Sequence, residues 1–142
     1  MIEINKSSSW KDCLENWDSI KITSDMEKAK SLIETAKGRI EINKDLNDKT
    51  ANYIFEDYYS SILELIHAII LLDGYKVMNH VCIGFYLRDM MKRDDLFRIF
   101  DDCRYKRNSL VYYGKRMEFK TAVDAIKKAK KLFNELIILL KF

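Results

Sequence analysis

The 142-residue sequence contains no proline and only four glycines. The turns of β-sandwiches and β-barrels depend on both residues, so their scarcity disfavours an all-β fold and favours long helices. A large excess of one charge is also lacking, because 25 basic residues stand against 22 acidic ones. This balance excludes an acidic disordered tail and a strongly basic nucleic-acid coat.

Cysteine is scarce as well, with three widely separated residues: Cys13, Cys82 and Cys103. An odd number without a Cys-x-x-Cys pair favours neither a disulfide framework nor a zinc cluster. We therefore predict reduced thiols and a cytoplasmic protein. No stretch approaches the roughly 20 apolar residues that cross a bilayer, and the N-terminus has no signal-peptide core. No membrane partner is expected.

Apolar residues make up 48% of the chain, which is enough for one core at this length. We predict a single domain of residues 1–142, in which residues 1–22 can stand apart as a peripheral N-terminal segment. Apolar residues recurring at three- and four-residue steps predict a bundle of helices. The predicted segments are residues 8–20, 28–42, 51–72, 80–92 and 94–113, followed by a last segment that begins at Glu118 or Thr121 and reaches Leu140.

The segment over 51–72 is the clearest, and the pair Asp73-Gly74 should end it because glycine accepts the left-handed conformation. Short loops between long amphipathic helices favour antiparallel neighbours. The predicted fold is therefore an all-α, up-and-down bundle of four to five helices.

One position interrupts this pattern. The apolar stripe of the segment from Leu96 to Leu110 reaches Cys103, and its next position is Arg107. An arginine stays charged, so burying it without a partner is very costly. Two alternatives are open. In the first, Arg107 holds a phosphate together with its neighbours on the adjacent stripe, which are Arg104, Asn108 and Tyr112. In the second, Arg107 pairs with a carboxylate, and the candidates are Glu56, Asp57 and Glu64.

The stretch from about Tyr58 to Tyr113 resembles the HEPN superfamily of small helical-bundle proteins. The likeness lies in YYSSILELIHAIILLDGYKVMNH, which contains Gly74, Tyr75 and His80, and in DCRYKRNSLVYYG. HEPN ribonucleases carry an arginine, then a polar residue, then a histidine. By resemblance Arg107 takes the place of the arginine and Asn108 that of the polar residue. Tyr112 stands where the histidine is expected.

In active HEPN ribonucleases, the arginine and histidine of two protomers meet in a dimer cleft and cut RNA without a metal ion. A tyrosine has an ordinary pKa of about 10, against about 6.5 for histidine, so Tyr112 is a poor general base near neutral pH. The resemblance therefore implies a degenerate catalytic motif of Arg107, Asn108 and Tyr112, with weak or absent activity and no cofactor.

HEPN proteins often work beside a minimal nucleotidyltransferase in toxin–antitoxin-like pairs. The resemblance implies such a partner here, together with a homodimer whose cleft binds nucleotide or RNA through Arg104, Arg107 and Tyr113. Tyr112 and Tyr113 are the candidates for nucleotidylation by the partner. Two other functions stay open: a metal-independent endoribonuclease toxin, and a structural bundle that binds other proteins.

The remaining patterns are weaker. Glu64 and His67 form one Glu-x-x-His step of a di-iron bundle, but a second step is missing, so no metal site is predicted. His80 caps the fourth helix, contacts solvent or lines a cleft with Arg107. Cys103 is expected to pack in the core. The lysines of the last helix are either solvated or contact nucleic acid, and several tyrosines, including Tyr58, Tyr59 and Tyr105, are candidates for stacking on bases.

Overall fold

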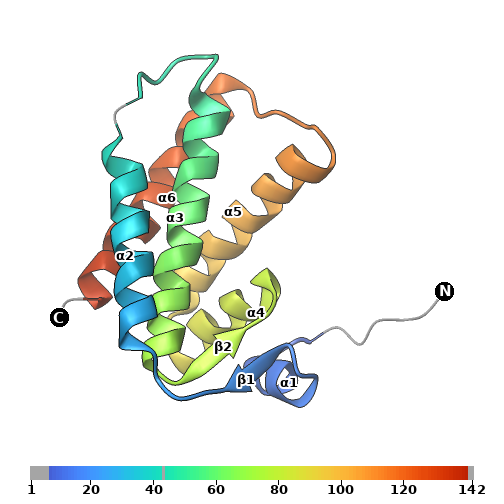
Figure 1. Cartoon of the computed structure of the whole chain (residues 1–142). Helices are drawn as coiled ribbons and strands as arrows, with labels where there is room; N and C mark the ends of the chain where they lie inside the picture. Colours follow the sequence, from blue (N-terminus) through green and yellow to red (C-terminus); the bar gives the residue numbers. More distant parts are fainter. Residues whose placement is uncertain (1–6, 43, 141–142) are drawn as a thin grey trace.

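The computed structural model describes residues 7–42 and 44–140. Its main elements are four long helices: α2 (Met26–Glu41), α3 (Ala51–Leu72), α5 (Asp94–Tyr112) and α6 (Phe119–Leu139). Successive long helices run in opposite directions, and α3 lies at the centre with α2 and α6 packed against it (Figure 1). The described chain is mostly helical, which confirms the all-α prediction in its coarse form.

The ends of these helices follow the local chemistry. The Asp25 side chain accepts a hydrogen bond of 3.0 Å from the Lys28 backbone N–H and thereby caps α2. Helix α3 ends at Leu72 with Asp73 as its C-cap, and Gly74 follows with a φ of +88°. A Cβ atom at Gly74 would lie 3.2 Å from the Ile22 carbonyl oxygen, so this position requires glycine for its space as well as its conformation.

A small antiparallel sheet lies at the lower end of the bundle in Figure 1, where β1 (Ser19–Lys21) pairs with β2 (Tyr75–Val77). The prediction of one helix over residues 8–20 is therefore wrong at its C-terminal end, since α1 covers only Trp10–Glu15. The predicted helix over 80–92 is also shorter: α4 (His80–Phe85) passes into a π-helical turn, η1 (Tyr86–Met90).

Cys13 and Cys82 form a disulfide, with Cα atoms 6.0 Å apart. The interpretation of all three cysteines as unpaired is therefore wrong, and the cysteines give no support for a reducing compartment. The bond joins α1 to α4, and Trp10 adds edge-on contacts with Tyr75 and Tyr86 at centroid distances of 5.5 and 4.9 Å. The described part of the N-terminal segment is thus anchored to the bundle covalently and by packing.

The core contains most of the predicted apolar stripes. Cys103 is buried and free, as expected, and Phe55, Ile62 and Leu65 of α3 are fully buried. Phe100 of α5 is also fully buried. No helix in the described ranges has the length and apolar character needed to cross a membrane.

Candidate functional site around Arg107

Arg107 lies half-buried on α5, beside two aromatic rings. Its guanidinium carbon is 5.6 Å from the centroid of the Tyr59 ring and 5.8 Å from that of the Tyr112 ring. Both distances fall within the range of about 6 Å over which a cation is attracted to the face of an aromatic ring. The break in the apolar stripe therefore corresponds to a cation held between Tyr59 and Tyr112.

Two of the three carboxylates predicted as alternative partners of Arg107 pair with other residues, and the third, Glu56, forms no ion pair with Arg107 within the described residues. Glu64 pairs with Arg39, and Asp57 pairs with Lys44. Within the described residues, Arg107 forms no ion pair and no hydrogen bond through its side chain. Its charge is balanced only weakly by the two rings, so the site retains the capacity to bind an anion.

Tyr59 connects Arg107 to the centre of the bundle. It is buried on α3, where its ring stacks on Phe100 with centroids 5.9 Å apart. Burial raises the pKa of Tyr59, and the nearby charges of Arg107 and Arg104 oppose that rise only in part. The phenol therefore stays protonated throughout the physiological range and acts as a neutral hydrogen-bonding group.

His80 approaches the same site from a third element. His80 is the first residue of α4, and its Nδ1 atom lies 3.2 Å from the Tyr59 hydroxyl oxygen. The Asn79 side chain caps this helix by accepting a hydrogen bond of 2.8 Å from the Cys82 backbone N–H, which fixes the start of α4. Asn79 and not His80 therefore caps α4, and His80 lies in the surroundings of Arg107.

The electrostatic surroundings keep His80 neutral. Burial lowers the pKa of His80, and the positive charges of Arg107 and Arg104 lower it further. A neutral imidazole beside a guanidinium can accept a proton from, or donate a hydrogen bond to, a ligand that the guanidinium holds.

The other predicted site residues occupy different surroundings. Arg104 is mostly buried and pairs with Asp101 at 3.0 Å, so its charge is partly neutralised. Asn108 is half-buried. Tyr112 and Tyr113 have 68% and 75% of their surface exposed, so their rings and hydroxyl groups are accessible. The structure thus brings Arg107 and Tyr112 together and adds Tyr59 and His80 to them.

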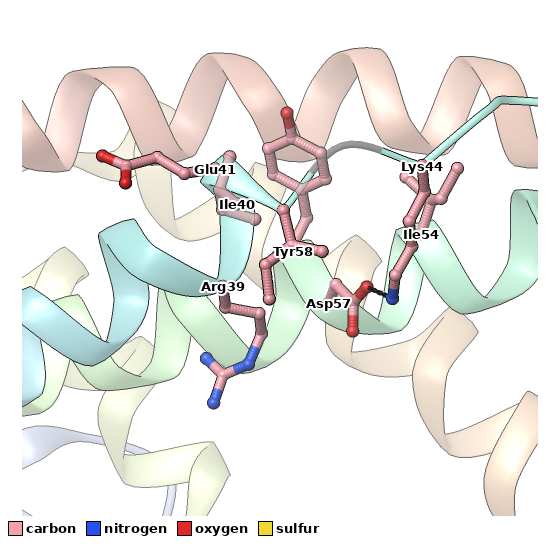
Figure 2. A pocket seen from close by; sticks show the side chains of 8 residues that line it. Arg39, Ile40, Glu41, Lys44, Ile54, Asp57 and Tyr58 are labelled. Atoms are coloured by element: carbon pink, nitrogen blue, oxygen red, sulfur yellow. Dashed lines mark hydrogen bonds and ion pairs between the residues drawn. The ribbon is translucent and has the colours of Figure 1, made fainter.

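A cavity of about 260 Å³ between the end of α2 and the start of α3 is a less suitable site (Figure 2). Figure 2 shows Lys44 directed at Asp57, with which it forms an ion pair. The Arg39 guanidinium pairs with Glu64 outside the group of side chains drawn there. Three of the four charged residues that line this cavity, Arg39, Lys44 and Asp57, therefore already have partners. In residues 7–42 and 44–140, no group of three or more potential His, Cys, Asp or Glu ligands is close enough to hold a metal ion.

Both histidines should titrate at low pH. Burial lowers the pKa of His67 and of His80 from the ordinary value of 6.5. A histidine whose pKa is lower in the folded than in the unfolded state stabilises the fold above about pH 6.5, and that stability is lost as the pH falls towards the folded pKa. We expect both ring-proton NMR titrations to have midpoints below 6.5, and the free energy of unfolding to fall between pH 7 and pH 5.5.

The double variant His67→Gln/His80→Gln is the control for this pH dependence and should lose most of it. A midpoint above 6.5 for either histidine would show that its ring is not buried beside positive charge as described.

The chain matches no protein-family model, no curated protein and no solved structure.

Proposed function

We propose that the Arg107 site binds the phosphate group of a nucleotide or of RNA, and that the protein is a HEPN-type domain. The observation that carries this proposal is the half-buried Arg107 guanidinium, which has no carboxylate partner within the described residues. A guanidinium matches the geometry of a phosphate and forms charge-assisted hydrogen bonds with it. His80 and the Tyr59 hydroxyl supply further polar groups beside it.

The exposed tyrosines support a ligand that carries bases. Tyr112 contacts the Arg107 guanidinium with its ring and is largely exposed, and Tyr113 is more exposed still. Aromatic rings of this kind stack on bases of any sequence, with about 1–3 kcal/mol per base by alanine substitution. Arg107 then holds a phosphate while Tyr112 or Tyr113 holds a neighbouring base. Arg104, whose charge is partly neutralised by Asp101, contributes less to this binding.

The HEPN resemblance extends the proposal to partners. A homodimer would bring two Arg107 sites to one cleft, and a minimal nucleotidyltransferase would modify Tyr112 or Tyr113. In that reaction the phenolic oxygen attacks the α-phosphorus of ATP, a phosphodiester bond forms, and pyrophosphate leaves while the phenolic proton passes to a base. The exposure of both hydroxyl-bearing rings supports this step. Mass spectrometry after incubation with ATP and such an enzyme tests it, and unmodified Tyr112 and Tyr113 would argue against it.

Retained endoribonuclease activity is the second candidate, and the position of His80 favours it. Tyr112 cannot serve as a general base near neutral pH, but His80 places a neutral imidazole in the surroundings of Arg107. His80 would take the proton of a ribose 2′-hydroxyl, which attacks the adjacent phosphorus and expels the 5′-oxygen with a proton from water. Arg107 would stabilise the charge on the phosphate.

The test of the binding function is the anisotropy of a fluorescein-labelled single-stranded RNA. Replacement Arg107→Gln should weaken binding by about tenfold or more, because hydrogen bonds to charged groups contribute about 1.5–3 kcal/mol. The matched control is Arg98→Gln, which removes the same charge from an exposed position of α5 where the arginine pairs with Asp94. Its effect should be small. Equal losses in the two variants would indicate that only net charge matters.

The same variants separate the two candidate functions. If the protein cuts the RNA, His80→Gln should abolish cleavage while binding persists, and Arg107→Gln should reduce both. If no RNA is cut by the wild-type protein, the endoribonuclease alternative is removed and the binding function stands on the anisotropy alone. If no RNA and no nucleotide binds, the structural protein-interaction module is the remaining function.

A further inference from the structure

A second cavity, of about 210 Å³, lies where the start of α2, the end of α3 and β2 meet. These elements converge at the lower end of the bundle in Figure 1. Helix α2 contributes Lys28 and Leu32, α3 contributes His67 and Leu71, and β2 contributes Tyr75, Lys76 and Val77. At about 30 Å³ for each water molecule of the liquid, this volume corresponds to roughly seven waters, which suits a small organic molecule.

The charged groups around this cavity are of one sign. Lys28 and Lys76 both line it, and among the described residues no carboxylate does. Neither lysine forms an ion pair within the described residues, whereas Lys44, Lys106 and Lys128 each do. The Asp25 carboxylate, near Lys28 in sequence, is used to cap α2. Both lysine side chains are exposed and line the cavity, and neither has a counter-charge among the described residues.

His67 adds an unused polar group to the wall. Its side chain makes no hydrogen bond within the described residues. Within the described residues, the side-chain polar atoms that are fully buried and have no hydrogen-bond partner are Trp10 Nε1 and Ser19 Oγ. The His67 ring nitrogens are not among them, so they are not fully buried. The ring therefore opens onto the cavity that it lines. Burial is the largest cause that lowers the pKa of His67, and the nearby charges of His80 and Lys28 lower it further.

Apolar side chains make up the rest of the wall. Leu32 and Tyr75 are half-buried and Val77 is buried, so a ligand with an apolar body would gain contact with all three. Water alone would hydrate the lysines but would leave this apolar surface exposed to solvent. The combination of two cations, a neutral imidazole and apolar walls is typical of a site for a small molecule with one acidic end.

We propose that this cavity binds a small amphipathic anion. Its short apolar body lies against Leu32, Tyr75 and Val77, and its carboxylate or phosphate monoester group lies at Lys28 and Lys76. His67 donates a hydrogen bond to the ligand from its neutral ring. This binding site is independent of the one proposed at Arg107, since it is formed by different residues on α2, α3 and β2.

The test uses methyl-labelled full-length protein and three ligands of equal chain length: hexanoate, hexyl phosphate and hexanol. Hexanoate or hexyl phosphate should shift the Leu32 and Val77 methyl resonances saturably, and the tighter of the two identifies the acidic group. Hexanol, which lacks the charge, should bind about tenfold more weakly or worse, the factor expected when a charge-assisted hydrogen bond is lost.

Two double variants complete the test. Lys28→Gln/Lys76→Gln should weaken binding of the acid about tenfold or more, whereas Lys30→Gln/Lys37→Gln, which removes two exposed lysines of α2 outside the cavity, should leave it unchanged. Arg107→Gln should also leave it unchanged. Equal affinity for hexanol and for the acids, shifts that never saturate, or full binding by Lys28→Gln/Lys76→Gln would each overturn the proposal. The comparison of hexanol with the two acids uses the wild-type protein, so it tests the proposal even if a variant does not fold.

Discussion

The double variant Cys13→Ser/Cys82→Ser is expected to lose about 4 kcal/mol of unfolding free energy. The disulfide joins residues 69 positions apart, and chain-entropy treatments assign about that much to a loop of this length. Without it, α1 would be held only by noncovalent contacts, which include Trp10 and the three-residue pairing of β1 with β2. Urea denaturation of the variant and the wild type, both without reductant, measures the difference.

Thiol counting and reductant provide the controls for this result. Burial raises the pKa of the Cys103 thiol to about 12, so Cys103 should not react with a thiol reagent in the folded protein. Denaturation without reductant should then expose one thiol per chain. Reductant should lower the melting temperature of the wild type and leave that of the double variant unchanged. Three reactive thiols in the unreduced, denatured protein would contradict the pairing of Cys13 with Cys82.

Replacement of Phe100 by alanine is expected to cost about 3–5 kcal/mol, the usual range for removing a fully buried phenylalanine. The Phe100 ring stacks on Tyr59 and packs over Gly84, where a Cβ atom would lie 3.2 Å from it. It therefore joins α5 to both α3 and α4. Because Tyr59 and His80 lie on those two helices, the variant should also weaken RNA binding under conditions where it remains folded.

The matched control for this prediction is Phe119→Ala at the start of α6, where 41% of the side chain is exposed. That change should cost about 1 kcal/mol or less, as is usual for partly exposed positions. Denaturation curves of both variants give the comparison. Similar losses for Phe100→Ala and Phe119→Ala would contradict the position of Phe100 at the centre of the core.

The long helices were predictable because their signals are local and repeated. The stripe over residues 51–72 coincides with α3, and Glu118, one of the two predicted starts of the last segment, is the N-cap of α6. The expected left-handed conformation at Gly74 is confirmed by its φ of +88°. Each of these features depends on neighbours within two turns of the chain, and many residues contribute to each pattern.

The sheet and the disulfide could not be predicted for the opposite reason. Strands β1 and β2 have three residues each, which is too short for a period-two pattern, and Ser19 pairs with Val77 far along the chain. Cys13 and Cys82 meet only because α1 packs beside α4. The π-helical turn at Tyr86–Met90 likewise left no signal in the spacing of apolar residues.

The candidate site was predictable only in part, because Arg107 has a local signal in the sequence and the contact of His80 has none. Arg107 was identified because a charged residue occupies a position where the stripe requires an apolar one. The contribution of Tyr59 had a weaker signal, since it lies four residues after Phe55 and three before Ile62 on the buried face of α3. The contact of His80 with Tyr59 depends on how α4 folds back against α3, and no local pattern encodes that arrangement.

NMR tests directly whether Arg107 binds a phosphate group, by recording the Arg107 Nε–H resonance while AMP is added to the wild-type protein. If Arg107 binds the phosphate, this resonance should shift saturably, while that of Arg98, paired with Asp94 on the same helix, should not move. Adenosine, which lacks the phosphate, should produce little change at Arg107. An Arg107 resonance that stays in place while AMP shifts signals elsewhere would contradict a phosphate site at this residue.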